Sequence, residues 1–441
     1  MQDGERTRRR FLSFLAVAGG AGVTGCLDEG TDDEDENNSQ QPENTSDEGD
    51  RNGGGNETSE DEQDAEDEEE DEEFEAGEPY EDVIEPGPAD WISERYDVRN
   101  TGVNPESGTP ESLEEDWSFE SDLQITRLPV FADGKVYVGS GRSADDMGLL
   151  HAIDSESGEE DWSIETEDGV RSSPTVTSST VYLSTIGGDL VAVNVEDGSE
   201  RWSRDIGGSS RGSPAVKDGM VYVGSGDGTV YAVGAYSGDV RWTFETSLNV
   251  VTVPAVADGA VYFGSNGGTV YALDTETGDE LWSFEAGGNV SSSPAVVDGT
   301  VYFGSNDFNV YAVDASNGDE LWDEPFETEN WVTSSPSVST DSQASSDGAV
   351  FVGSYDNSLY AVNPETGEEL WSYDADARIL TSPAVADGYV YITSNDGILH
   401  VVDTSDGTEV DTTETEGSSP TSPVVADGSV YVANGLSLFS F

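Results

Sequence analysis

Apolar and polar residues alternate along most of the chain after residue 112, in short runs separated by Gly, Asp and Asn. In the copy that begins at Ser293, "SPAVVDG" is followed by "VYFGS", "NVYAVD" and "ELWDE". Alternation with a period of two predicts a β-strand for each run. Asp298-Gly299 predicts a two-residue hairpin turn between the first two strands, because Gly tolerates a positive φ. We also expect the Asp314 side chain to accept backbone N–H groups, and Gly318 to supply another positive φ.

This four-strand unit is repeated along the chain, most often at an interval of 40 residues. A proline opens the first run of each copy, at Pro129, Pro174, Pro214, Pro254, Pro294, Pro336, Pro383 and Pro423. A tryptophan recurs in the fourth run, at Trp117, Trp162, Trp202, Trp242, Trp282, Trp322 and Trp371, and Asp411 takes the eighth position. A period near 40 filled with four short strands is typical of the blade of a β-propeller.

The two ends of the repeated region complete one another. The first run, "DWSFE" around Trp117, is an outer strand with no strands before it, and the last copy, from Ser422 to Phe441, has three strands and no outer one. Joining them predicts an all-β, eight-bladed β-propeller of four-stranded blades, closed by pairing of its N- and C-terminal strands. We place this domain at residues 89–441, with "WISERYDVRNTG" at 91 as a lead-in that packs on the ring.

Within each copy, small and turn-forming residues stand at fixed distances before the tryptophan, as at Ala272, Asp274, Gly278 and Trp282. This pattern resembles the tryptophan-docking motif of PQQ-like (quinoprotein-type) propellers, in which the ring packs one blade against the next. The resemblance implies a structural role for Trp162, Trp202, Trp242, Trp282, Trp322 and Trp371. The motif varies: Asn replaces Asp at Asn194 and Asn363, Gly234 replaces it in the third copy, and the seventh copy lacks the tryptophan.

The chain carries a formal net charge of -76, from 93 acidic and 17 basic residues. Such a surface repels itself strongly in dilute buffer, and molar salt screens that repulsion. The composition resembles that of proteins from extreme halophiles, with haloarchaea as the expected source. Nucleic acid is not expected as a partner, because binding to phosphates needs clustered Lys and Arg.

The N-terminus combines three targeting signals. Arg8 and Arg9 resemble the twin-arginine export motif, and the apolar run from Phe11 to Val23 is shorter than the roughly 20 residues of a membrane span. The only cysteine, Cys26, follows in a sequence that resembles a lipobox, although a chance cysteine after an apolar segment is the alternative. We therefore expect a signal peptide at residues 1–26 and a lipid anchor on Cys26, at the extracellular face of the membrane.

Residues 27–88 are predicted to form a disordered acidic tether. From Asp28 to Asp82 the chain has 28 Asp or Glu and a single basic residue, Arg51. No apolar periodicity is present, so this segment cannot bury enough surface to offset its conformational entropy. Mutual repulsion of its charges should keep it extended.

Two classes of function compete for the propeller. Quinoprotein dehydrogenases, which the repeat resembles, typically carry a disulfide between adjacent cysteines and carboxylate and Asn ligands for calcium. The chain has one cysteine, and His151 and His400 fill a third-strand slot that holds Tyr in other copies. We therefore expect no catalytic residues, no metal and no PQQ. The other class is a monomeric scaffold similar to the BamB lipoprotein, which holds envelope proteins or peptides.

Candidate contact residues lie three or five positions before the inner-strand prolines, in the loops that enter the inner strands. Although the chain has few basic residues, it keeps several in these equivalent places, together with an aromatic residue. The candidates are Arg171, Arg211, Trp331, Arg378, Asn249 and Asn289. One interpretation is that the arginines pair with nearby carboxylates. The other is that this rim binds an anionic ligand or an acidic peptide.

Overall fold

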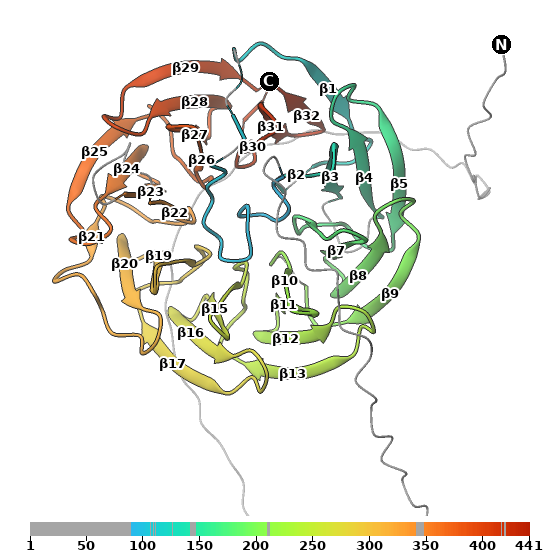
Figure 1. Ribbon diagram of the computed structural model, residues 1–441, viewed down its shortest axis with the longest axis horizontal. Coiled ribbons are helices and arrows are strands. Elements are labelled where there is room, and N and C mark those ends of the chain that lie inside the picture. Colours follow the sequence, from blue (N-terminus) through green and yellow to red (C-terminus); the bar gives the residue numbers. More distant parts are fainter. Residues whose placement is uncertain are drawn as a thin grey trace, which may run out of the picture. The chain divides into compact units, whose positions relative to one another are not determined.

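The computed structural model describes residues 90–441, apart from 106, 109, 111, 126, 142–146, 210, 211, 341–347, 416 and 419. In these residues the regular elements are all β-strands, and they form eight four-stranded antiparallel sheets arranged as the blades of a ring (Figure 1). The predicted eight-bladed propeller is confirmed. No helix among the described residues is long and apolar enough to span a membrane.

Each blade runs outward from the axis of the ring. The inner strands are β2 (Val130–Ala132), β6 (Thr175–Val176), β10 (Ala215–Lys217), β14 (Ala255–Ala257), β18 (Ala295–Val297), β22 (Ser337–Ser339), β26 (Ala384–Ala386) and β30 (Val424–Ala426). The second strands are β3 (Lys135–Ser140), β7 (Thr180–Ser184), β11 (Met220–Gly224), β15 (Ala260–Gly264), β19 (Thr300–Gly304), β23 (Ala349–Gly353), β27 (Tyr389–Thr393) and β31 (Ser429–Asn434).

The third strands are β4 (Gly148–Asp154), β8 (Asp189–Asn194), β12 (Thr229–Gly234), β16 (Thr269–Asp274), β20 (Asn309–Asp314), β24 (Ser358–Val362), β28 (Ile398–Asp403) and β32 (Ser437–Ser440). The outer strands are β5 (Glu160–Thr166), β9 (Glu200–Asp205), β13 (Val240–Glu245), β17 (Glu280–Glu285), β21 (Phe326–Glu327), β25 (Glu369–Asp374), β29 (Glu409–Glu414) and β1 (Trp117–Glu120). Blade 1 is β2–β5, the following blades continue in chain order, and blade 8 is β30–β32 with β1.

Blade 8 joins the two ends of the propeller, as the sequence predicts. Strand β1 pairs antiparallel with β32, with Trp117 opposite Ser440 and Phe119 opposite Leu438. The backbone of the last residue, Phe441, exchanges two hydrogen bonds with Val430 in β31. The eight sheets therefore close into a ring, and the edge of β32 is covered by a strand from the other end of the domain (Figure 1).

The turns follow the predicted chemistry. Asp298 and Gly299 have φ values of 49° and 79° in the β18–β19 hairpin, the positive-φ geometry of a tight two-residue turn. Between β20 and the outer strand, Asp314 Oδ1 accepts the backbone N–H of Ser316 at 2.8 Å, and Gly318 has φ 75°. These hydrogen bonds hold the acidic side chain in the turn.

The tryptophans of the outer strands lock neighbouring blades together. Trp282 lies opposite Ala272 in its own blade, and its Nε1 donates a hydrogen bond to the carbonyl of Ala315 in the next blade at 2.9 Å. Its ring lies against Gly318 of that blade so closely that an added Cβ would sit 2.8 Å from Cε3. The docking glycine therefore packs on the tryptophan of the preceding blade. The same hydrogen bond is made by Trp117, Trp162, Trp202, Trp242, Trp322 and Trp371.

The missing tryptophan of blade 7 has a topological reason. A docked ring needs the turn that joins the third and outer strands of the next blade, as Trp371 uses the turn with Thr404 and Gly407. In blade 8 these two strands, β32 and β1, come from opposite ends of the domain, so no turn joins them. Asp411 accordingly stands exposed on β29.

Candidate functional site

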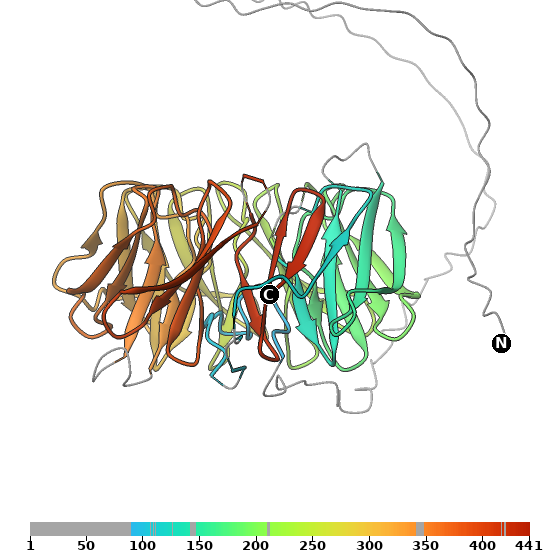
Figure 2. The same ribbon diagram turned by 90° about the horizontal axis from the view of Figure 1, so that it is seen from above.

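Residues 91–104, which we call the lead-in, lie inside the ring at one end of the central channel (Figures 1 and 2). Six inner strands donate a backbone N–H to a lead-in carbonyl, each from the residue two positions after its proline. The donors are Phe131, Val176, Val256, Val296, Val338 and Val385, at 2.7 to 3.0 Å. Blade 8 is reached by Asn104, whose Nδ2 donates to Val425 O at 3.1 Å, and blade 3 by Glu94, which accepts from Ser213 Oγ. The lead-in thus bonds to every blade and pairs most of the free inner edges.

Arg95 and Asn100 fix the lead-in to the carbonyls that face the channel. Arg95 is 1% exposed, and its two Nη atoms donate to the carbonyls of Ser335, Pro336 and Pro383 at 2.7 to 3.3 Å. Burial lowers the pKa of Arg95 to about 10, and the charges of nearby carboxylates oppose that shift. Asn100 Nδ2 donates in the same way to two carbonyls of blades 4 and 5. These side chains are therefore parts of the fold.

The small polar pairs that precede the prolines are also used by the fold. In blade 6, the Ser334 hydroxyl accepts the N–H of Gly353 in the second strand at 3.1 Å. The Ser335 hydroxyl accepts the N–H of Ser293, the equivalent residue of blade 5, at 2.9 Å. The second contact recurs between successive blades at Ser213, Ser293, Ser382 and Ser422. The hydroxyls before five of the eight prolines therefore link adjacent blades, whereas the buried Ser173 Oγ has no hydrogen-bond partner among the residues that the structure describes.

The predicted rim residues lie on the face of the ring where the prolines open the inner strands, which we call the proline face. The carbonyls of Asn249, Asn289, Trp331 and Arg378 each accept an N–H at 2.9 to 3.0 Å from the turn between a second and a third strand. These four residues therefore lie beside the turns between the second and third strands of blades 4 to 7. Arg171 is half-buried in blade 2, where its carbonyl accepts from Arg127 Nε at 2.9 Å. Arg211 lies outside the described residues.

Two of these residues, Trp331 and Arg378, are brought together through a third. The Trp331 and Tyr355 rings meet edge to face with centroids 5.5 Å apart, and the guanidinium carbon of Arg378 lies 5.6 Å from the Tyr355 centroid. Trp331 is 46% exposed. Trp331 and Arg378 are exposed and Tyr355 between them is half-buried. Trp, Tyr and Arg are the residue types that most often dominate protein interfaces.

Tyr355 was not among the predicted site residues, although the sequence holds a signal for it. The turn "SNGG" at 265 and the turn "SNDG" at 394 place Asn where "SYDN" at 354 places Tyr355. A departure from the repeat at a surface turn marks a position that packing does not dictate. Only the structure shows that this departure meets the one at Trp331.

Both histidines lie in third strands, as predicted. His151 in β4 is 3% exposed, its Nδ1 contacts Glu160 Oε2 at 2.8 Å, and its Nε2 contacts the Ser121 hydroxyl at 3.1 Å. Burial lowers the pKa of the His151 imidazole, and the hydrogen bond to Glu160 opposes that shift. Burial likewise lowers the pKa of His400 in β28. The Ser121 side chain is buried, and its contacts with Ser140 and His151 join blade 8 to blade 1.

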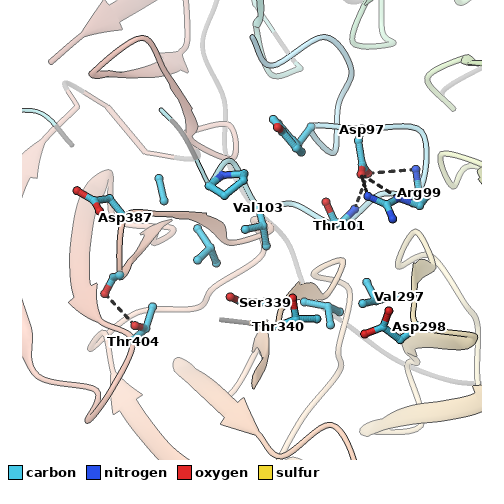
Figure 3. A pocket seen from close by; sticks show the side chains of 16 residues that line it. Asp97, Arg99, Thr101, Val103, Val297, Asp298, Ser339, Thr340, Asp387 and Thr404 are labelled. Atoms are coloured by element: carbon cyan, nitrogen blue, oxygen red, sulfur yellow. Dashed lines mark hydrogen bonds and ion pairs between the residues drawn. The ribbon is translucent and has the colours of Figure 1, made fainter. Parts of the chain in front are cut away.

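A cavity of about 450 Å³ lies at the opposite face, between the lead-in and the inner hairpins of blades 5 to 7 (Figure 3). Its floor is apolar, with Val297, Val338 and Val385, and acidic turn residues stand at its margin. The only basic residue in its lining, Arg99, donates two hydrogen bonds to Asp97 Oδ2 at 3.1 and 3.2 Å. This cavity therefore offers no unpaired cation to an anionic ligand.

The remaining predicted functional residues cannot be placed. Cys26, Arg8 and Arg9 lie outside the described residues, as does the proposed tether. Within the described part of the chain, no group of three or more His, Cys, Asp or Glu side chains is arranged to hold a metal ion.

Comparison with known proteins identifies one family and several solved structures that share its fold. A family model described as outer membrane protein assembly factor BamB matches residues 102–210, 187–341 and 327–440. The chain is similar to the crystal structure of BamB from Moraxella catarrhalis, with a TM-score of 0.62 and 22% identity over 75% of this chain and 99% of that one. No curated protein sequence matches the chain.

Two further solved structures share the fold. The computationally designed Ika8 protein has a TM-score of 0.64 and 20% identity over 74% of this chain and 99% of that one. Quinohemoprotein alcohol dehydrogenase from Comamonas testosteroni has a TM-score of 0.64 and 15% identity over 80% of each chain. At these identities the solved structures show a shared propeller fold and do not assign an activity.

Proposed function

The chain belongs to the PQQ-like repeat family described as outer membrane protein assembly factor BamB, and on this premise we propose that it is a non-catalytic binding scaffold of the cell envelope. In this proposal Arg8 and Arg9 direct twin-arginine export, Cys26 carries a lipid anchor, and residues 27–88 tether the propeller outside the membrane. The propeller, at residues 89–441, then holds envelope proteins or peptides as a monomer.

The lead-in is the observation that carries this proposal. The chain's own residues 91–104 fill one end of the channel and bond to all eight blades. At that end, the axial space in which a propeller enzyme can enclose a cofactor is taken up by backbone and by buried side chains such as Arg95. What the ring leaves available is its surface, which supports binding of partners to its faces.

A PQQ-dependent dehydrogenase is the alternative, and the residues present do not fit that cofactor. With Cys26 as the only cysteine, the propeller cannot form a disulfide between adjacent cysteines. Five of the serine hydroxyls beside the channel are engaged between blades, as at Ser335. The described residues also offer no cluster of carboxylates and histidines for calcium. We therefore include no quinone in the proposal.

One experiment separates the two classes. The full-length protein is mixed with PQQ and Ca²⁺ at high salt and desalted, and its quinone absorbance and alcohol oxidation are measured. We expect neither to exceed the values of a desalted control without protein. Retained absorbance together with turnover of an alcohol would overturn the non-catalytic role.

The scaffold role is tested in cells by placing a photo-reactive amino acid at one exposed position on each surface. Glu329, two residues before Trp331, represents the proline face, Leu281 the outer strands, and Asp387 the opposite face. We expect covalent adducts with envelope proteins from at least one position. If none of the three positions gives an adduct, the scaffold proposal is wrong.

A further inference from the structure

Large exposed side chains gather over blades 5 to 7 on the proline face. Phe308 is 39% exposed, Trp331 46% and Leu380 38%. The backbone links them: Phe308 O accepts the N–H of Thr328, three residues before Trp331, and Leu380 follows two residues after Arg378. We call Phe308, Trp331, Tyr355, Arg378 and Leu380 the aromatic arc.

The fold does not require aromatic residues at these positions. Blade 4 has Asn249 and Asn266 where blade 6 has Trp331 and Tyr355, and Asn266 Nδ2 there donates to Asn249 Oδ1 at 3.3 Å. The backbone hydrogen bond between the two positions is the same in both blades, at 3.0 Å. The aromatic pair therefore replaces a working polar pair, and exposes apolar surface that the polar pair would not.

Phe308 adds backbone strain to this departure from the repeat. It has φ 79° at a turn position that holds glycine in other blades, as at Gly268 with φ 85°. A bulky side chain is strongly disfavoured at positive φ, and such outliers concentrate at functional surfaces. Because the Phe308 side chain is exposed, packing inside the protein does not account for it.

Arg378 supplies the charge of the arc. It is the only Lys or Arg between Trp242 and Phe441. Among the described residues no carboxylate lies within ion-pairing distance of its guanidinium, which instead contacts the Tyr355 ring. In so acidic a protein, a cation that stacks on an aromatic ring keeps N–H donors for an anion from outside.

We propose that the aromatic arc binds a peptide segment in which a carboxylate stands next to a large apolar side chain. The carboxylate accepts hydrogen bonds from Arg378, and the apolar side chain covers Trp331 and Leu380. This inference rests on the proposed scaffold function and names the chemistry of its partner. A peptide with basic residues would instead pair with the carboxylates of the surrounding surface, so the test includes a Lys peptide.

Binding is measured by fluorescence anisotropy with the full-length chain in about 2 M KCl, where long-range repulsion is screened. Three labelled peptides share a central Leu-Phe and carry Asp, Asn or Lys on both sides of it. We expect the Asp peptide to bind at least about tenfold more tightly than the Asn peptide, the effect of a hydrogen bond to a charged group.

Variants that restore the repeat assign the binding to the arc. Trp331→Asn and Arg378→Asn install the residue that blades 4 and 5 use at the same position, so the fold should be retained. Each is expected to weaken binding of the Asp peptide about tenfold or more without changing the melting curve. Asn249→Ala, the equivalent position in blade 4, is the control and should bind as the wild type does.

Three results would overturn the inference: no peptide binds the wild type, the Lys peptide binds best, or the two arc variants bind like the wild type. These results are distinct from failure of the scaffold function. Envelope adducts from Leu281 or Asp387 without any from Glu329, beside the arc, would overturn the arc proposal and keep the scaffold. Quinone-dependent turnover would remove the scaffold whatever the peptides do.

Discussion

Single side chains at fixed positions of the repeat connect each blade to the next. The tryptophan ring crosses to the following blade, and the serine hydroxyl before five of the eight prolines crosses to the preceding blade. Both replace water at a backbone group. The third strand adds an aromatic contact, in which Phe284 meets Tyr311 edge to face with centroids 5.3 Å apart. Buried apolar clusters accordingly span two neighbouring blades, as Val270 and Val301 share one.

Gly278→Ala tests the docking contact. Gly278 has φ 73°, and an added Cβ would lie 2.6 Å from Trp242 Cδ2. Gly259 has φ 81° and nothing within 4 Å, so Gly259→Ala carries the backbone strain alone. We expect both variants to lose about 1–2 kcal/mol of unfolding free energy through positive φ, and Gly278→Ala to lose about 1–3 kcal/mol more by overpacking. Equal losses in urea unfolding at high salt would contradict the contact.

The histidines give a residue-scale prediction for pH. Burial lowers the folded-state pKa of His400 below its ordinary value of 6.5. The unfolded chain therefore binds more protons below that pH, so the free energy of unfolding should fall as the pH drops from about 7 to 5. In the same slot Tyr360 donates to Asp356, and Asp396 stands at the matching position in blade 7.

His400→Tyr should therefore weaken this pH dependence, measured as the difference in urea midpoint between pH 7 and pH 5. The reverse exchange, Tyr360→His, should strengthen it. If neither variant changes this difference, a histidine in this third-strand position does not titrate on unfolding, and the prediction for His400 is wrong.

At the scale of elements, the order of a segment depends on the hydrogen bonds that neighbouring segments make with it. Blade 5 has the shortest outer strand, β21, which follows a proline at 325, yet Trp322 still donates to Pro364 O at 2.9 Å. The lead-in has no regular secondary structure of its own over most of its length, and it is ordered by the inner strands that it pairs with. The conformation of the lead-in therefore depends on its tertiary contacts with the inner strands.

Asp411→Trp places a tryptophan on blade 7 and tests whether it can dock on blade 8 without a turn between the third and outer strands of that blade. Blade 8 has no turn between its third and outer strands, so the new ring has nothing to dock on. We expect the free energy of unfolding to change by no more than about 0.5 kcal/mol, as for an ordinary surface substitution. Trp282→Asp should cost about 3–5 kcal/mol, because it empties a docked site. A stabilised Asp411→Trp protein would show that blade 8 supplies a docking site.

At the scale of the whole molecule, closure and charge act in opposite directions. The ring is closed by β1, and Trp117 in that strand donates to Ser155 O of blade 1 at 2.8 Å. The net charge of -76 favours expansion of the chain at low salt. Stability should therefore depend on both the closing strand and the salt concentration.

Deleting residues 112–121 removes the closing strand and leaves the edge of Ser437–Ser440 unpaired. We expect the melting temperature at high salt to fall by several degrees, since loss of a docked tryptophan alone costs about 3–5 kcal/mol. Deleting ten residues of the proposed tether, 60–69, is the control and should leave the melting curve unchanged. An unaltered melting curve for the first deletion would rule out a stabilising role for closure.

Anchoring is tested by Cys26→Ser. If Cys26 carries the lipid, the variant should move from the membrane fraction to the soluble fraction, while Arg8→Lys with Arg9→Lys should block export. Both are measured by fractionation and immunoblotting after a salt wash. A Cys26→Ser protein that still sedimented with membranes would end the lipoprotein proposal.

The sequence by itself determined the blades, because strand and turn depend on local alternation and on residues such as Asp298 and Gly299 that act within their own hairpin. It also determined closure, since a lone outer strand at Trp117 and a blade without one must pair. Partners far apart along the chain were decided only by the tertiary structure. Three contacts depend on which surfaces the closed ring places together: Arg95 with the carbonyls of blades 6 and 7, Ser335 with the preceding blade, and Trp331 and Arg378 with Tyr355. No local pattern encodes them, because the partners are far apart along the chain.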